Sequence, residues 1–367
     1  MTSKRISDLE KFFKMKKIHV KIEYRFVERY NYNGIIAVFE EIIRKNSGCC
    51  FDLTGGKELV LTAMGAVSTK FDIPMVQFNV RTGNFIHVKN SCDIVARNDS
   101  SMKISECVML NGGKVVYDGE GETKWNLTEE FRNDIENIWN ICKYDCTLWN
   151  KQSKLLGFIE NDDVSLDVNV DLDEMHFPNN DRLDEQFLRV LADNELILML
   201  SYKNNRLRFK YKNEQIKRCI LKAGNILELY IYMIAYEIND EKNNYYEDIN
   251  IGVTLDWDGI VNRNRRFLLT ETRNEVDVML MKGMIPIFIS CKNGVAHKEA
   301  LYELFSVAEK FGGKYSKKIL VTTCDKIKDK SFDYIIKRAH DMNIRIIYGI
   351  DGMSKKEIKK KLKIYAK

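Results

Sequence analysis

The stretch Thr272-Arg-Asn-Glu-Val-Asp-Val-Met-Leu-Met281, followed by Ile285-Pro-Ile-Phe-Ile-Ser-Cys-Lys-Asn-Gly294, decides the fold of the C-terminal part of this chain. Both runs have the pattern of strands. Lys282-Gly283 lies between them and predicts a tight turn. The two runs therefore predict a pair of neighbouring strands in one sheet.

Polar side chains lie at defined positions on these predicted strands. Because side chains alternate between the two faces of a strand, Glu275 and Asp277 share one face. Ser290 and Lys292 share a face of the second strand, and Cys291 points to the other. A hairpin can therefore bring Asp277 and Lys292 together at one end of a sheet.

A carboxylate and a lysine on paired strands suit metal-assisted phosphodiester cleavage. The carboxylate holds a hard divalent cation, which activates water, and the lysine offsets charge on the phosphate. Upstream, residues 224–237 predict an apolar helix that carries a second carboxylate, Glu228. The alternative is that Glu275 and Asp277 form a solvated strand face without chemistry. These residues resemble the PD-(D/E)xK nuclease motif, with Ser290 where many members have another carboxylate.

Length and composition limit the class of protein. With 367 residues, 45% hydrophobic and 30% charged, the chain predicts a globular protein of two or three domains. The net charge of +5 is compatible with a nucleic-acid substrate. We expect no signal peptide and no membrane span, because no apolar run is long enough. The nine cysteines contain no Cys-x-x-Cys pair, which indicates a reduced, cytoplasmic protein.

The N-terminal part alternates strands and helices. Residues 18–27 and 49–54 predict strands, and residues 34–45 and 57–69 predict helices. This alternation is typical of an α/β domain with a parallel sheet, which we place at residues 1–125. Residues 216–367, which contain the helix and hairpin described above, predict a second α/β domain.

Residues 126–215 differ in pattern from the regions on either side. Residues 164–172 alternate strictly, with an acidic row that indicates either a solvated edge strand or, less simply, a cation site. Residues 196–202 and 206–211 predict a hairpin. A helix followed by a hairpin predicts a small winged-helix-like connector. Far downstream, Ser354-Lys-Lys-Glu357 predicts the start of a lysine-rich helix, with either a solvated basic face or phosphate contacts.

A second candidate site lies in the N-terminal domain. Asp52-Leu-Thr-Gly-Gly-Lys57 lies between a predicted buried strand and a helix. Gly55 and Gly56 let backbone amides approach a ligand, and the helix N-terminus favours a phosphate. Ligands of open α/β sheets bind beyond the carboxyl ends of strands, where this loop lies. The alternative is a glycine turn with no ligand.

Taken together, the motifs resemble a known family. Asp52-Leu-Thr-Gly-Gly56 looks like the ligand loop of CARF domains, which sense cyclic oligoadenylates in type III CRISPR defence. A CARF domain, a connector and a PD-(D/E)xK domain are the arrangement of one CRISPR ancillary nuclease family. Further family-like residues are Gly224 to Glu228, Asn274 to Val278, Cys291 to Asn293, Ala300 to Leu304 and Phe311 to Gly313. Against the family pattern, Lys57 and Glu58 replace a threonine and a lysine, and the first βαβ unit of a CARF domain is not recognisable in the sequence.

The resemblance implies a homodimeric, metal-dependent nuclease that cuts single-stranded DNA or RNA. The activator would be a cyclic oligoadenylate, and cyclic tetra-adenylate in particular, bound by Asp52, Thr54, Gly55, Gly56 and Lys57. Glu228, Asp277 and the Cys291 carbonyl would hold Mg²⁺ or Mn²⁺. Lys292 would orient water or stabilise the phosphate, and Ser290 would position a water. The alternative function is a non-catalytic, nucleotide-responsive DNA-binding regulator with a decayed nuclease domain.

Overall fold

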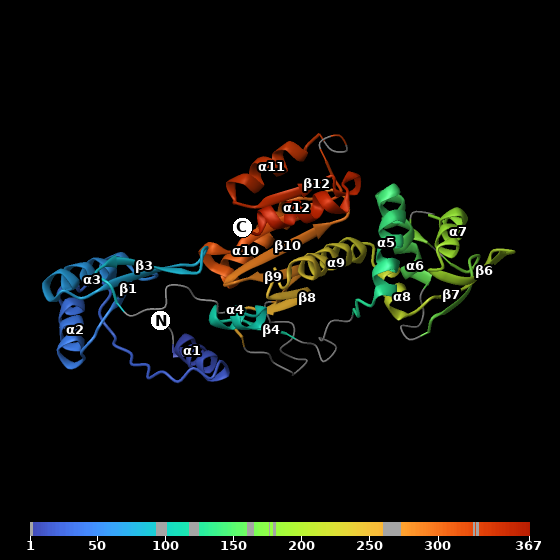
Figure 1. Cartoon of the computed structure of the whole chain (residues 1–367). Helices are drawn as coiled ribbons and strands as arrows, with labels where there is room; N and C mark the ends of the chain where they lie inside the picture. The colour runs from blue at the N-terminus through green and yellow to red at the C-terminus, as the bar shows by residue number, and fades with distance from the viewer. Residues whose placement is uncertain are drawn as a thin grey trace. The chain divides into compact units, whose positions relative to one another are not determined.

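The chain folds into two compact units (Figure 1). The first is Met1–Ser101 with Gly283–Ile285, and the second is Met102–Lys282 with Pro286–Lys367. The computed structural model describes residues 3–92, 101–116, 125–159, 165–175, 177–178, 181–259, 273–325, 327 and 330–367. Residues 164 and 272, which belong to segments predicted above to be strands, lie outside the described residues.

The first unit contains a small mixed sheet and three helices. Its strands are β1 (Phe51–Asp52), β2 (Met75–Asn79) and β3 (Asn84–Lys89), in the order β1-β2-β3. β1 and β2 are parallel, whereas β2 and β3 are antiparallel. The helices are α1 (Ser3–Met15), α2 (Tyr32–Lys45) and α3 (Glu58–Phe71). The expected parallel arrangement is therefore found for β1 and β2 alone.

The strand predicted at residues 18–27 is wrong. Residues 18–28 form neither helix nor strand, and the Phe26 side chain is 82% exposed. Alternation of apolar residues gives a strand only where a neighbouring strand supplies hydrogen bonds and a core covers the apolar face. Among the described residues no strand pairs with this segment, and none of its own residues is buried, so its sequence pattern was misleading.

The second unit is built on a six-stranded sheet in the order β12-β11-β10-β9-β8-β4. The central strands are β8 (Asp248–Asp256), β9 (Arg273–Lys282) and β10 (Ile285–Lys292), which include the two strands predicted from the sequence. β8 and β9 are antiparallel, whereas β10 is parallel to β11 (Lys317–Thr322), and β11 to β12 (Arg345–Tyr348). The helices are α4 (Ile104–Leu110), α9 (Asn225–Lys242), α10 (Lys298–Gly312), α11 (Phe332–Asp341) and α12 (Lys355–Tyr365).

Alternate residues of β10 enter two different cores. Ile287 and Ile289 belong to the cluster that includes residues of α9 and α12, whereas Phe288 belongs to the cluster that includes residues of α10 and α11. Both faces of the sheet are therefore covered by helices, as expected for parallel strands buried on both sides.

The two compact units divide at a different place from the domain boundary predicted at residue 125. Residues 102–116 belong to the second unit, where Val108 of α4 and Val115 of β4 (Lys114–Val115) are buried in one core. β4 pairs antiparallel with β8. A two-residue edge strand carries no sequence signal that names its partner, so only the packing reveals where it belongs.

The predicted connector has the expected helix and hairpin, but it is not a separate unit. It comprises α5 (Glu129–Tyr144), α6 (Cys146–Ile159), β5 (Asp167–Asp171), α7 (Glu185–Asp193), β6 (Ile197–Lys203), β7 (Arg206–Tyr211) and α8 (Glu214–Leu221). Trp139, Leu188 and Phe209 of this region belong to the same buried cluster as Ile231 of α9. The connector and the nuclease-like sheet therefore share one core.

The acidic row of the connector lies on an edge strand, β5. The sheet order is β5-β7-β6, so β5 lies at the edge. Asp167, Asn169 and Asp171 lie opposite Lys210, Arg208 and Arg206 of β7. The Asn169 Oδ1 atom accepts hydrogen bonds from the Nε atoms of Arg206 (3.0 Å) and Arg208 (3.1 Å). Basic residues on the neighbouring strand thus balance this row, as opposite charges do across paired strands.

Candidate functional site

The candidate nuclease site combines one helix and two neighbouring strands. Glu228 lies in the first turn of α9, Asp277 lies on β9, and Ser290 and Lys292 lie near the end of β10. β9 and β10 are neighbours in the sheet. The strand pattern predicted that Asp277 and Lys292 would meet, and the family resemblance implied that Glu228 would lie beside them.

Asp277 is the centre of this group. Its Oδ2 atom accepts a hydrogen bond of 2.6 Å from the backbone N–H of Cys291 and one of 3.2 Å from the Ser290 hydroxyl. The Lys292 Nζ atom lies 3.6 Å from the same oxygen, and the Asp277 side chain is only 17% exposed. All three contacts fall on one carboxylate oxygen, so β10 fixes the orientation of the Asp277 side chain.

The environment of Glu228 disfavours its charged form. Burial, together with the negative charges of Asp277 and Glu275, raises the pKa of the Glu228 carboxyl to about 8, against the opposing effect of Lys292 and Lys222. The negative charges of these neighbouring carboxylates repel one another, and a divalent cation bound between them would neutralise that charge.

Two members of this environment were not among the predicted site residues. Glu275 is exposed on β9 and Lys222 is exposed in the loop between α8 and α9. Both affect the charge of Glu228. The alternation of β9 indicated Glu275, but no local pattern indicated Lys222.

The donor atoms fit a hard cation. Within the described parts of the chain, no group of three or more His, Cys, Asp or Glu side chains is placed to hold a metal ion. The candidate ligand set is therefore limited to the carboxylates of Glu228 and Asp277, with backbone oxygen and water. Such an all-oxygen set suits Mg²⁺ or Mn²⁺, which keep several waters and take one or two carboxylates. The Cys291 thiol is buried, and burial raises its pKa well above the usual value, so this sulfur is a poor ligand.

The candidate phosphate-binding loop follows β1 in the first unit. The Asp52 Oδ1 atom accepts hydrogen bonds from the backbone N–H of Thr54 (2.9 Å) and from the Thr54 hydroxyl. The Thr54 Oγ1 atom in turn accepts a hydrogen bond of 2.7 Å from the backbone N–H of Phe78 on β2. Asp52 and Thr54 thus hold the loop against the ends of the two parallel strands, so their side chains are engaged in building the loop.

Gly55 leaves space beside the backbone of this loop, and the backbone conformation of Gly56 favours glycine. A Cβ atom on Gly55 would meet no described atom within 4 Å, and Gly56 has a φ of +146°, which favours glycine. Lys57 is the N-cap of α3, and its side chain makes no cap hydrogen bond. The start of α3 therefore has the geometry of a helix N-terminus that could receive an anion.

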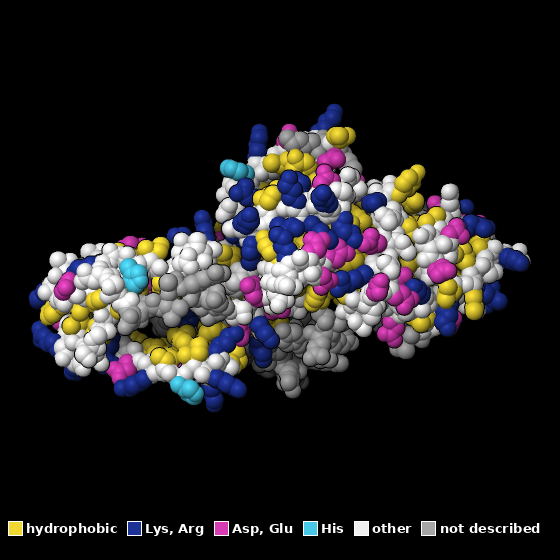
Figure 2. Space-filling view, in the orientation of Figure 1, with side chains coloured by type: hydrophobic (Ala, Val, Ile, Leu, Met, Phe, Trp, Pro, Cys, Tyr) yellow, Lys and Arg dark blue, Asp and Glu magenta, His cyan; other side chains and the backbone are white. Residues whose placement is uncertain are grey.

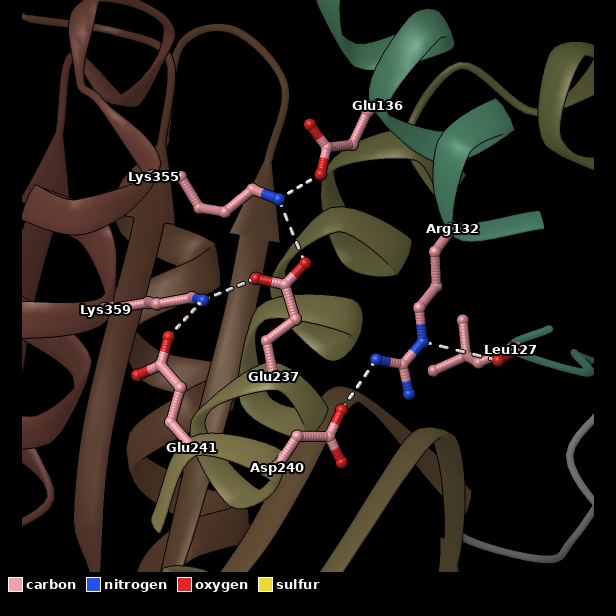
Figure 3. A network of polar contacts seen from close by, with 8 residues as sticks. All are labelled: Leu127, Arg132, Glu136, Glu237, Asp240, Glu241, Lys355 and Lys359. Carbon is pink, nitrogen blue, oxygen red and sulfur yellow. Dashed lines mark hydrogen bonds and ion pairs between the residues drawn. The ribbon is translucent and has the colours of Figure 1, made fainter. Parts of the chain in front are cut away.

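Three of the six lysines of the final helix, Lys355, Lys359 and Lys363, are used in internal ion pairs. Figure 2 shows Lys and Arg side chains gathered over α12, with Asp and Glu beside them. The Lys359 Nζ atom lies 2.6 Å from Glu237 Oε2 and 2.8 Å from Glu241 Oε1, both on α9 (Figure 3). Lys355 binds Glu237 at 3.0 Å and also contacts Glu136 of α5. These lysines hold α5, α9 and α12 together, and neither alternative predicted for the helix, a solvated face or phosphate contacts, applies to them.

Comparisons with known proteins define the class of fold. No protein-family model and no curated protein matches this sequence. The solved structure of protein VC1899 from Vibrio cholerae is similar, with a TM-score of 0.73 at 16% identity, over 98% of this chain and 87% of that chain. Can2 from Sulfobacillus thermosulfidooxidans, solved in complex with cyclic tetra-adenylate, is similar with a TM-score of 0.66 at 14% identity, over 99% of this chain and 89% of that chain.

The chain therefore has the α/β fold of these two proteins along nearly its whole length. The predicted α/β fold class is confirmed, and the resemblance to the CARF-domain ancillary nucleases is confirmed at the level of the fold. Among the described residues, no helix is both long and apolar enough to cross a membrane.

Proposed function

We propose that this protein is a metal-dependent nuclease that a cyclic oligoadenylate switches on. The single observation that supports it most is the meeting of Glu228, Asp277 and Lys292 on α9, β9 and β10. Two carboxylates and a nearby lysine suit the binding and cleavage of a phosphodiester. The product would be a shortened, single-stranded DNA or RNA.

In this proposal Glu228 and Asp277 hold Mg²⁺ or Mn²⁺, and the backbone carbonyl of Cys291 completes the protein ligands. When bound, the cation lowers the pKa of a coordinated water and polarises the phosphate. The Asp277 Oδ2 atom already accepts hydrogen bonds from β10, which would leave the Oδ1 atom for the cation. Lys292 stabilises the phosphate charge or orients the attacking water, and Ser290 supports Asp277 and positions a water.

The proposed sensor is the loop of Asp52, Thr54, Gly55, Gly56 and Lys57. Support comes from its place at the carboxyl ends of parallel strands, at the N-terminus of α3, and from the fold shared with Can2, which was solved with cyclic tetra-adenylate. We assign cyclic tetra-adenylate as the activator. Asp52 shapes the loop through Thr54, whereas the backbone of Gly55 and Gly56 and the side chain of Lys57 face the phosphates.

The proposed setting is antiviral defence in the cytoplasm, by a type III CRISPR system. A cyclic tetranucleotide has two-fold symmetry, so a homodimer would present two equal loops to it.

A regulator with a decayed nuclease site is the competing function. The described chain retains Glu228, Asp277 and Lys292 in one place, which favours the enzyme.

The test is cleavage of single-stranded DNA and RNA in the presence of Mn²⁺, with and without cyclic tetra-adenylate. We expect cutting that requires the metal and rises when the cyclic nucleotide is added. Binding of cyclic tetra-adenylate without any cutting of either substrate would favour the regulator. Absence of both binding and cutting would contradict both functions.

A further inference from the structure

Helix α6 of the connector contacts the chain beside two of the three elements that carry the candidate nuclease site, α9 and β10. Two consecutive residues, Trp149 and Asn150, reach different targets. The Trp149 Nε1 atom donates a hydrogen bond of 3.2 Å to the Ala223 carbonyl, in the loop that enters α9. One turn further along α6, the Ser153 hydroxyl donates a hydrogen bond of 2.6 Å to the Ile220 carbonyl in α8. α6 thus holds the chain just before Glu228.

Asn150 holds the end of the strand that carries Lys292. The Asn150 Nδ2 atom donates a hydrogen bond of 2.7 Å to the Asn293 carbonyl, and the Asn293 Nδ2 atom donates one of 2.8 Å back to Asn150 Oδ1. The Asn150 side chain thus bonds both the backbone carbonyl and the side chain of Asn293. Asn293 directly follows Lys292, so these two bonds fix the backbone from which the lysine side chain extends.

Asn293 is also tied to its other neighbours. The Thr323 hydroxyl donates a hydrogen bond of 3.3 Å to Asn293 Oδ1, and the Thr323 backbone N–H donates one of 3.3 Å to the Lys292 carbonyl. On the connector side, Asn293 Nδ2 lies 3.3 Å from the Cys142 sulfur of α5. The end of β10 is thus held between β11 and the connector, and the contacts from the connector centre on Asn150 and Asn293.

We propose that Asn150 is a positioning residue of the nuclease site, through which α6 sets the placement of Lys292 relative to Glu228 and Asp277. The proposal rests on the proposed nuclease function and adds the residue by which the connector controls it. Trp149 fixes α6 against the start of α9, and Asn150 fixes the same helix against the end of β10. A movement of α6 would shift one side of the site relative to the other, and catalysis is sensitive to such shifts.

Gln152 provides a matched control for Asn150. It lies in the same helix, two residues later, and its side chain also makes two hydrogen bonds. The Gln152 Nε2 atom donates to the Arg182 carbonyl at 3.3 Å, and Oε1 accepts from the backbone N–H of Asp184 at 2.9 Å. Both of these partners belong to the connector. Gln152→Ala therefore removes an amide and two hydrogen bonds from α6 without touching the end of β10.

The activity test compares Asn150→Ala, Asn150→Asp and Gln152→Ala in the full-length protein with Mn²⁺ and cyclic tetra-adenylate. We expect both Asn150 variants to lower kcat by about 10- to 100-fold with little change in KM, because a small misplacement of a catalytic group has that effect. Asn150→Asp keeps the shape and the acceptor but replaces the donor to Asn293 with a negative charge, so a loss in this variant does not come from lost packing. The kcat of Gln152→Ala should stay within about threefold of the wild-type value, even if its Tm falls as far as that of the Asn150 variants. Equal losses in the Asn150 variants and Gln152→Ala, or full activity in the Asn150 variants, would overturn the proposal.

A second readout does not depend on cleavage. Hydrogen exchange of the backbone amides of residues 291–294 should be faster by about 10-fold or more in Asn150→Ala and unchanged in Gln152→Ala, because only the first variant frees the end of β10. Unchanged exchange in Asn150→Ala would overturn the positioning role even in a preparation that cuts nothing. If the wild-type protein does not cut, but hydrogen exchange in the variants changes as expected, the result would contradict the proposed nuclease function and leave the positioning role of Asn150 intact.

Discussion

Cys291 donates its backbone N–H to the Oδ2 atom of Asp277 across β9 and β10, at 2.6 Å. This bond, the Ser290 hydroxyl and the nearby Lys292 hold the Asp277 carboxylate in one orientation. A carboxylate fixed at this position is the feature on which the proposed metal site depends.

Asp277→Ala should abolish metal-dependent cutting. Each of two carboxylates supplies a full charge to a hard cation, so the loss of one weakens metal binding steeply. We expect cutting to fall by at least about 100-fold at saturating Mn²⁺, in line with the loss of a group that acts in the transition state. Asp167→Asn, which removes a charge from the edge strand of the connector, is the control and should cut normally. Equal rates for Asp277→Ala and wild type would show that the site is assigned wrongly.

Gly55→Val should prevent activation by cyclic tetra-adenylate without unfolding the sensor. The position of a Cβ on Gly55 is open, so the valine fits the protein and occupies the space that a ligand would need. Calorimetry with cyclic tetra-adenylate should show binding by wild type and none by the variant, while basal cutting persists. Gly65→Val, on α3 in the same unit, also places its Cβ in open space and should bind as wild type does. Equal binding by Gly55→Val and wild type would remove this loop as the ligand site.

The metal-free protein should lose stability as the pH rises from about 5 to 8. The folded-state pKa of Glu228 is raised to about 8, against about 4.3 for an unfolded glutamate. Between these values the folded protein binds a proton that the unfolded chain has released, so the free energy of unfolding decreases as the pH increases, until the pH passes the folded pKa. Urea unfolding in EDTA should show a weaker pH dependence over this range for Glu228→Gln than for wild type. Parallel pH profiles for the two proteins would contradict the raised pKa.

Lys359→Ala should lower stability, whereas Lys356→Ala should not. The Lys359 side chain is 14% exposed and bonded to Glu237 and Glu241, so its loss removes one of the two lysines bound to Glu237 and the closer lysine partner of Glu241. We expect a loss of about 1–2 kcal/mol in urea unfolding. Lys356 is exposed on the same helix, and its removal should change stability by less than about 0.5 kcal/mol. A stable Lys359→Ala with weakened nucleic-acid binding would instead favour a role in substrate contact.

The protein should be a homodimer in solution. A two-fold symmetric activator is recognised most simply by two copies of one loop related by a two-fold axis. Light scattering at micromolar concentration should give about twice the mass of the chain, with and without cyclic tetra-adenylate. A monomer under both conditions would contradict the proposed arrangement of the sensor.

Much of the candidate nuclease site could be predicted because it rests on local patterns. The alternation in residues 272–281 and 285–294 fixes which side chains share a face of a strand, and a glycine turn fixes that the two strands are close. Asp277 and Lys292 therefore had to meet if a hairpin formed. The apolar helix with Glu228 was equally visible, since its burial follows from its composition.

Other features depend on contacts between distant segments, and only the tertiary structure decided them. The alternation of residues 18–27 resembled a strand, but no neighbouring strand pairs with it among the described residues. The sequence of residues 114–115 does not indicate a strand, but these residues pair with β8. This pairing places them in the second unit. The reciprocal bonds of Asn150 and Asn293 join residues 143 positions apart. Local sequence specifies the periodicity of an element and its turns, whereas its partner is set by which surfaces fit and which polar groups are satisfied when the whole chain packs.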